Sequence, residues 1–143
     1  MKRALALILA LVLCLALVAC GNEEKEEAGN PTTGANSTIV AFMKENGDAF
    51  LENLESGFKV SGMTCKSSYQ VVGNGLVVTI CVNELNNVDS ATKDAMQEAY
   101  TAMASTFDQA LKMLQQEITE LESLTIRVCE KDGDLLADLK VGK

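Results

Sequence analysis

The sequence predicts an α+β fold in the order helix, β-hairpin, long helix, β-hairpin. Two segments repeat apolar residues at the three- and four-residue spacing of an amphipathic helix. Four shorter segments are apolar or alternate apolar with polar residues, as strands do, and glycine-containing turns join them in pairs. These elements fit one antiparallel-rich four-stranded sheet with helices packed on one face, in a single small domain over residues 38–143.

The first 19 residues have the pattern of a signal peptide that ends at a lipidation site. Basic residues directly after the initiator methionine precede an uninterrupted apolar run over residues 4–19, which is short for a bilayer span. The run ends in Leu-Val-Ala-Cys, the order of a lipobox. We therefore expect cleavage between Ala19 and Cys20 and a diacylglyceryl group on Cys20. An ordinary secretory signal, in which this cysteine is incidental, is the alternative.

Residues 20–37 predict a flexible tether, because they are polar, acidic and interrupted by glycine and proline. Glu23 to Glu27 could form a cation or partner site, although a solvated, self-repelling run explains them fully. Without the leader the chain has 10 basic and 20 acidic residues, a net charge of −10. This balance disfavours binding to nucleic acid and to anionic lipid. Attachment to the extracytoplasmic face of the cell membrane would then depend on the two acyl chains at Cys20.

The first helix is expected over residues 38–56. Asn36 or Ser37 can cap its start, and Gly57 is well placed to end it. Gly47 weakens its middle, so a kink or break is an open alternative. The apolar stripe consists of Ile39, Phe42, Met43, Phe50, Leu51 and Leu54.

The first hairpin is expected over residues 63–71 and 76–82. Asn74 and Gly75 can adopt positive φ at low cost, so they are the expected loop residues. This loop sets a register that places the apolar residues of both strands on one face. Its pairs are Gly73 with Leu76, Val71 with Val78, Tyr69 with Ile80 and Ser67 with Val82.

The longest helix is expected from a cap at Asp89 or Ser90 to about Glu117. Residues 104–106 are the expected bend, and residues 118–122 are the expected connector, although a helix that continues to Leu121 would suit the periodicity. The apolar stripe consists of Ala91, Ala95, Met96, Ala99, Met103, Phe107, Ala110, Leu111 and Leu114.

The second hairpin is expected over residues 124–130 and 135–141, around Asp132-Gly133. Its register would place Arg127 opposite Asp138 as a cross-strand ion pair. The apolar pairs are Val128 with Ala137, Ile126 with Leu139 and Leu124 with Val141.

Three cysteines remain after Cys20 and the leader, so at most one internal disulfide can form. Cys81 and Cys129 both project from the face opposite the apolar one, late in their strands. If these strands are parallel neighbours, the two residues form a candidate disulfide; two partly covered thiols are the alternative. Cys65 shares the apolar face and is expected to be a core thiol rather than a nucleophile.

No residue pattern indicates catalysis, a metal or a cofactor. Histidine is absent, which removes the usual general base and the commonest metal ligand. We therefore expect a non-enzymatic binding module for an envelope protein, a peptide or a small ligand. The alternative is an extracytoplasmic enzyme or thiol-redox protein that uses Cys81 and Cys129, or grouped carboxylates.

The outer sheet face could bind a ligand or a partner strand, although a solvated face has the same composition. It carries Thr64, Lys66, Ser68, Gln70, Val77, Thr79, Cys81, Thr125 and Arg127.

Three features together resemble a known family. They are the run from Gly62-Met63-Thr64-Cys65 to Leu76-Val77-Val78, the Thr106-Phe107 pair, and the closing strand, Asp-Gly turn and strand. The chain resembles small uncharacterised lipoproteins of clostridia-type bacteria, in a family catalogued as a domain of unknown function, number 4854. The resemblance covers about residues 38–141 and depends on turns and hydrophobic patterns. It implies surface anchoring of the Gram-positive type and supplies no catalytic residues.

Overall fold

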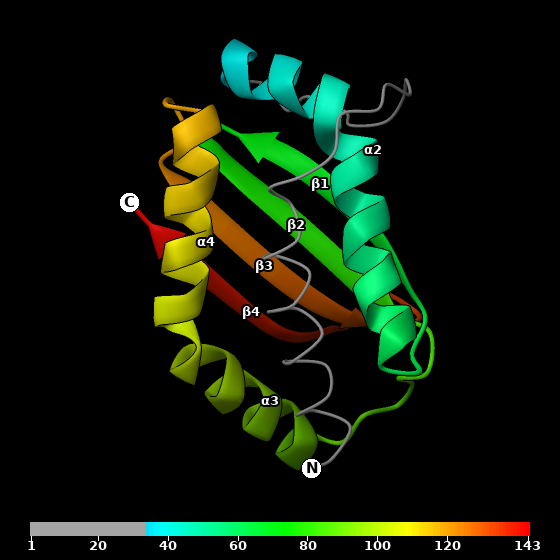
Figure 1. Ribbon diagram of the computed structural model, residues 1–143. Helices are drawn as coiled ribbons and strands as arrows, with labels where there is room; N and C mark the ends of the chain where they lie inside the picture. The colour runs from blue at the N-terminus through cyan, green and yellow to red at the C-terminus, as the bar shows by residue number, and fades with distance from the viewer. Residues whose placement is uncertain (1–33) are drawn as a thin grey trace.

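The computed structural model describes residues 34–143. Three helices of this region pack against one face of a four-stranded sheet (Figure 1), so the predicted α+β class is confirmed. The leader, the lipobox and residues 20–33 lie outside the described residues. Within residues 34–143, no helix has the length and apolar character needed to cross a membrane. The elements are α2 (Ser37–Val60), β1 (Cys65–Val72), β2 (Gly75–Val82), α3 (Ser90–Ala102), α4 (Ala104–Glu117), β3 (Ser123–Glu130) and β4 (Leu135–Gly142).

The strands follow their sequence order across the sheet. The two hairpins are antiparallel, whereas β2 and β3 pair in parallel at the centre. The parallel pair arises because α3 and α4 carry the chain back to the end of the sheet at which β2 began. The inner faces of the central strands form the core with fully buried side chains, namely Leu76, Val78, Ile80, Val82, Leu124, Ile126 and Val128.

The first helix begins as predicted but ends later. The side chain of Asn36 caps it by accepting hydrogen bonds from the Thr38 and Ile39 backbone N–H groups. The expectation that Gly57 ends the helix is wrong, because the apolar stripe continues to the buried Phe58. Gly62, with φ +77°, follows the last turn and takes the left-handed conformation that often ends helices.

α2 continues through Gly47 without a break but bends along its length (Figure 1), and the missing side chain of Gly47 makes room for β1. A Cβ atom there would lie 2.5 Å from Cε1 of Tyr69. The Tyr69 ring therefore packs directly on the helix backbone, and its hydroxyl donates a hydrogen bond to the Met43 carbonyl at 3.1 Å.

The first hairpin has its predicted strands but a different register. Gly73 and Asn74 form the loop, and Val72 pairs with Gly75. Within this loop Gly73 alone adopts a positive φ, +57°. A two-residue loop of this kind has a positive φ only at its first residue, where glycine is favoured. The predicted register is thus wrong by two residues. A shift by two keeps every side chain on its predicted face, and the pairs are Val71 with Leu76, Tyr69 with Val78, Ser67 with Ile80 and Cys65 with Val82.

The predicted long helix is two helices, α3 and α4, separated at Met103. The break lies one residue before the predicted bend. The Met103 N–H bonds to the Tyr100 carbonyl three residues back, which tightens the last turn of α3. Asp89 caps α3, and α4 ends at Glu117, both as expected.

The second hairpin has the predicted register throughout its apolar pairs. An irregularity after Val128 leaves Cys129 opposite Leu135. Arg127 lies opposite Asp138 as expected, but the predicted ion pair between them is not formed. The ion pairs among the described residues join Lys93 to Glu130 and Lys112 to Asp108.

Candidate functional site

The helices leave the other face of the sheet uncovered (Figure 1). Strand alternation places every second residue on this outer face, as predicted. Thr64 is the exception, because it precedes β1 and hydrogen bonds to Glu84 instead. We define the outer face as Lys66, Ser68, Gln70, Val72, Val77, Thr79, Cys81, Thr125, Arg127, Cys129, Leu135, Asp138 and Lys140.

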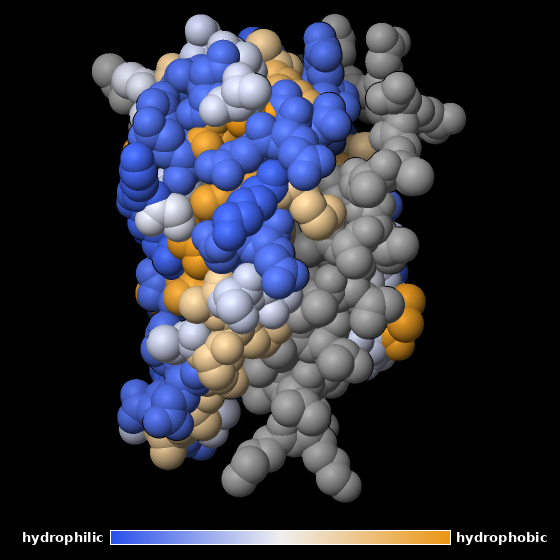
Figure 2. All heavy atoms as spheres, turned by 60° about the vertical axis from the view of Figure 1, so that its left-hand side comes forward, coloured by the Kyte–Doolittle hydropathy of each residue, from blue (hydrophilic) through white to orange (hydrophobic). Residues whose placement is uncertain are grey.

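The outer face has the opposite charge balance to the rest of the described chain. Residues 34–143 contain nine basic and 16 acidic residues. The outer face carries three basic residues, on β1, β3 and β4, and one acidic residue, Asp138. Most acidic residues of the described region lie on the helices and in the connections between elements, and the α4 side of the molecule is mostly hydrophilic (Figure 2). The sheet therefore presents a cationic surface on an acidic protein.

Apolar side chains are also exposed on the outer face. Four large hydrophobic residues of the described region are strongly exposed, and two of them, Val72 and Leu135, lie on this face at 50% and 49% exposure. They occupy opposite corners, since Val72 ends β1 and Leu135 begins β4. The face thus combines apolar and cationic groups, a combination suited to a partner with apolar and anionic side chains.

The structure brings the two predicted thiols together. Cys81 and Cys129 lie directly opposite each other on the parallel strands β2 and β3. Both are free thiols here, and the disulfide between them stays a prediction. Cys81 is partly exposed, whereas Cys129 is 5% exposed. Cys65 lies in the apolar core on the opposite face, as expected.

The surroundings of Cys129 disfavour its ionisation. Burial raises the pKa of Cys129 to about 11, with further contributions from the charge of Cys81 and from the hydrogen bond between the two thiols. The positive charge of Arg127 opposes this shift, and Asp134 adds to it. Cys129 is therefore protonated at neutral pH and is a poor nucleophile by itself.

A buried carboxylate directly follows the thiol pair along β3. Glu130 is 3% exposed, accepts a hydrogen bond from the Val88 N–H at 3.0 Å, and lies 3.4 Å from Lys93 Nζ. Burial acts to raise its pKa, but the Val88 and Lys93 contacts outweigh burial and lower it. The sequence did not indicate that Glu130 is buried and paired, because Val88 and Lys93 reach it only through the tertiary fold.

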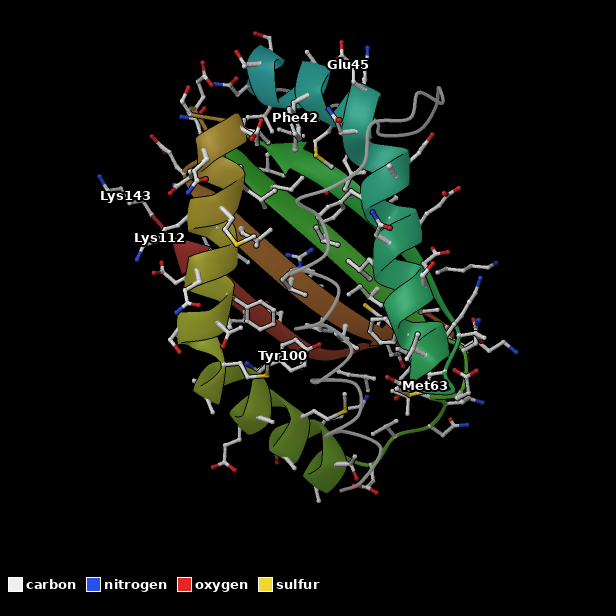
Figure 3. The ribbon with its side chains drawn as sticks, in the orientation of Figure 1. Phe42, Glu45, Met63, Tyr100, Lys112 and Lys143 are labelled. Atoms are coloured by element: carbon white, nitrogen blue, oxygen red, sulfur yellow. The ribbon has the colours of Figure 1, made fainter. Side chains whose placement is uncertain are left out.

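Tyr100 is another feature that sequence reasoning did not identify. It projects from α3 toward the sheet (Figure 3), is 1% exposed, and stacks on Phe107 with ring centroids 5.8 Å apart. Its hydroxyl is the one buried side-chain polar atom of the described region without a hydrogen-bond partner. Burial raises the pKa of this hydroxyl well above its ordinary value.

Side chains from the helices cover backbone groups at both edges of the sheet. Gln97 of α3 donates to the Asp138 carbonyl of β4 at 2.8 Å and accepts from the Asp138 N–H at 3.0 Å. On the other edge, Glu55 of α2 accepts from the N–H and hydroxyl of Ser67 on β1, at 2.9 and 2.8 Å. Since these groups are already paired, a partner strand cannot add there without displacing them.

Comparison with known proteins yields one match. A family model described as a domain of unknown function (DUF4854) matches residues 41–139. No curated protein and no solved structure matches the chain. Within residues 34–143, no group of three or more cysteine or carboxylate side chains is placed to hold a metal ion.

Proposed function

We propose that this chain, which belongs to the family described as a domain of unknown function (DUF4854), is a membrane-anchored surface lipoprotein with a non-enzymatic binding domain. Its partner is an acidic, partly apolar segment of another envelope protein. The observation that carries the proposal is the uncovered outer face, whose charge is opposite in sign to that of the surrounding protein.

The sequence supports the anchoring part of the proposal. The apolar leader and the Leu-Val-Ala-Cys motif predict a lipidated Cys20 at the start of the processed chain. A net charge of −10 after processing disfavours electrostatic attraction of the whole protein to anionic lipid. Two acyl chains would hold the protein on the membrane without that attraction, and the polar segment that follows Cys20 would let the domain reach neighbouring proteins.

The composition of the outer face supports a polypeptide partner. The three basic groups attract an anionic segment, and Val72, Val77 and Leu135 offer apolar contacts on the same face. A sugar-phosphate polymer would match the charges but would leave the apolar groups without a partner. The covered strand edges favour docking on the face rather than pairing with an edge strand.

A peptide-binding experiment tests this proposal. We expect the solubilised full-length protein to bind a fluorescent peptide of alternating glutamate and valine, measured by anisotropy at moderate salt. The triple variant Lys66→Glu, Arg127→Glu, Lys140→Glu should weaken this binding by about tenfold or more, because attraction becomes repulsion.

The matched control is Lys44→Glu, Lys59→Glu, Lys143→Glu, which changes the net charge equally at exposed sites away from the outer face. It should bind the peptide like the wild type. Equal weakening in both triple variants would refute a specific site. Binding to polyphosphate but not to the glutamate–valine peptide would contradict a polypeptide partner.

A thiol-redox role is the second candidate function. The observation that favours it is the direct pairing of Cys81 with Cys129 across neighbouring strands. This role does not depend on the charge of the outer face.

A further inference from the structure

The two central strands of the sheet carry a dithiol that solvent reaches from one side. Cys81 and Cys129 occupy the same register position on β2 and β3, and strand alternation places both on the face opposite the helix-covered core. Cys81 is partly exposed and Cys129 is buried beside it. Neither belongs to the apolar core cluster, which contains Cys65.

We propose that Cys81 and Cys129 form a thiol–disulfide exchange site, in which Cys81 attacks an external disulfide and Cys129 resolves the product. The Cys81 thiolate bonds to one sulfur of the external disulfide and releases the other as a thiolate. Cys129 then loses its proton, bonds to the Cys81 sulfur, and releases the second external thiolate. The two protons from the cysteines protonate the two released thiolates, so the protein dithiol is oxidised by two electrons and the external disulfide is reduced.

The exposures of the two thiols determine their order of reaction. An external disulfide can reach Cys81 from the open side of the sheet, whereas Cys129 at 5% exposure offers little access. The register position that the two residues share keeps Cys129 next to the sulfur that it must attack. The negative charge of Cys81 contributes to the raised pKa of Cys129, and this contribution disappears once Cys81 forms the mixed disulfide.

Strand geometry permits the bond and makes it reversible. Neighbouring strands lie about 4.8 Å apart, within the Cα separations of about 4.4–6.8 Å that admit a disulfide. Directly opposite side chains leave a sheet roughly parallel to each other, whereas an unstrained disulfide needs converging Cβ atoms. Strained disulfides are the more easily reduced ones, which suits exchange rather than permanent cross-linking.

Titration with the aromatic disulfide 5,5′-dithiobis(2-nitrobenzoate) tests the inference on the folded, acylated full-length protein. We expect the wild type to release two equivalents of coloured thiol and to lose two mass units without retaining an adduct. Peptide mapping should then place a disulfide between Cys81 and Cys129. This wild-type result requires no variant to fold.

The variants separate the two roles. Cys129→Ala should release one equivalent and retain the adduct on Cys81. Cys81→Ala should react at least about tenfold more slowly than the wild type. Cys65→Ala, a control outside the pair, should behave like the wild type. A stable adduct on wild-type Cys81 with no internal disulfide would overturn the inference, as would equal initial rates for Cys81→Ala and Cys129→Ala. Peptide binding to the outer face is a separate readout, so either proposal can fail alone.

Discussion

At the residue scale, Tyr100 and Tyr69 form a contrasting pair within one core. Both rings pack between the helices and the sheet, but their hydroxyls differ. The Tyr69 hydroxyl donates to the Met43 carbonyl, whereas the Tyr100 hydroxyl has no partner despite its burial. A buried polar group without a partner costs about 1–3 kcal/mol, because it loses its hydrogen bonds to water. Tyr100 thus reduces stability through one oxygen atom while its ring contributes packing against Phe107.

Removing that oxygen should stabilise the protein. We expect Tyr100→Phe to raise the free energy of unfolding by about 1 kcal/mol or more in urea denaturation, since the ring is kept and the desolvation cost disappears. Tyr69→Phe is the matched control and should lower it by about 0.5–1.5 kcal/mol, because a formed hydrogen bond is lost. A destabilised Tyr100→Phe variant would mean that the hydroxyl is hydrogen bonded in solution.

At the element scale, three carboxylates fix the segment that joins β2 to α3. Glu84 accepts from Thr64, Asp89 caps α3, and Glu130 accepts from the Val88 N–H. The pKa of each carboxylate is lowered, because its charged form is hydrogen bonded. A lowered folded-state pKa contributes stability that is present above the unfolded value and is lost as the pH falls through the folded value. The connection is therefore secure at neutral pH and sensitive to acid.

Acid should loosen this connection before it unfolds the sheet. Below the ordinary pKa of 4.5 for glutamate we expect the Val88 amide to lose protection in hydrogen exchange, and below the ordinary pKa of 3.8 for aspartate the Thr92 amide, after correction for the intrinsic rate. Amides in the centre of β3 should stay protected. Glu130→Gln is the control: it should weaken Val88 protection at neutral pH and reduce its further change with acid. Unchanged Val88 protection down to pH 3 in the wild type would contradict the prediction.

The elements also differ in how much of their structure could be predicted from the sequence. The Asp132-Gly133 turn allowed one loop placement, and the second hairpin was predicted in its correct register. Around Asn74, two glycines allowed two loop placements that leave the same side chains buried, so the pattern could not choose between them. The end of α2 depends on the burial of Phe58, and the buried contacts of Glu130 depend on Lys93 and Val88, which are tertiary facts.

The pairing of Cys81 with Cys129 was predicted only conditionally. Strand position and facing residues could be inferred from alternation and turns. Whether β2 and β3 are neighbours depends on how α3 and α4 cross the sheet, and no local pattern reports that path. The charge balance of the outer face was missed for a related reason, since it combines residues from three strands that only the strand order brings together.

At the scale of the whole molecule, the lipid proposed at Cys20 would determine where the domain works. We expect Cys20→Ala to abolish incorporation of a labelled fatty acid and to leave an unprocessed chain, because lipoprotein processing requires the modified cysteine. Cys14→Ala changes a cysteine inside the leader and should leave labelling and processing intact. Mass spectrometry and fatty-acid labelling measure both effects. Continued labelling of Cys20→Ala would place the acyl group elsewhere and remove the basis for the proposed anchor.

Gln97 and Glu55, whose side chains hydrogen bond to the edge strands, have a further consequence if the protein is held on a membrane. Tethering confines molecules to a thin layer, where their local concentration rises and collisions between copies become frequent. Sheets with bare edges would stack edge to edge under such crowding. By occupying the N–H and carbonyl groups of Asp138 and the N–H group of Ser67, side chains of the two helices would hinder such stacking on a shared membrane, while the open face stays accessible from solvent.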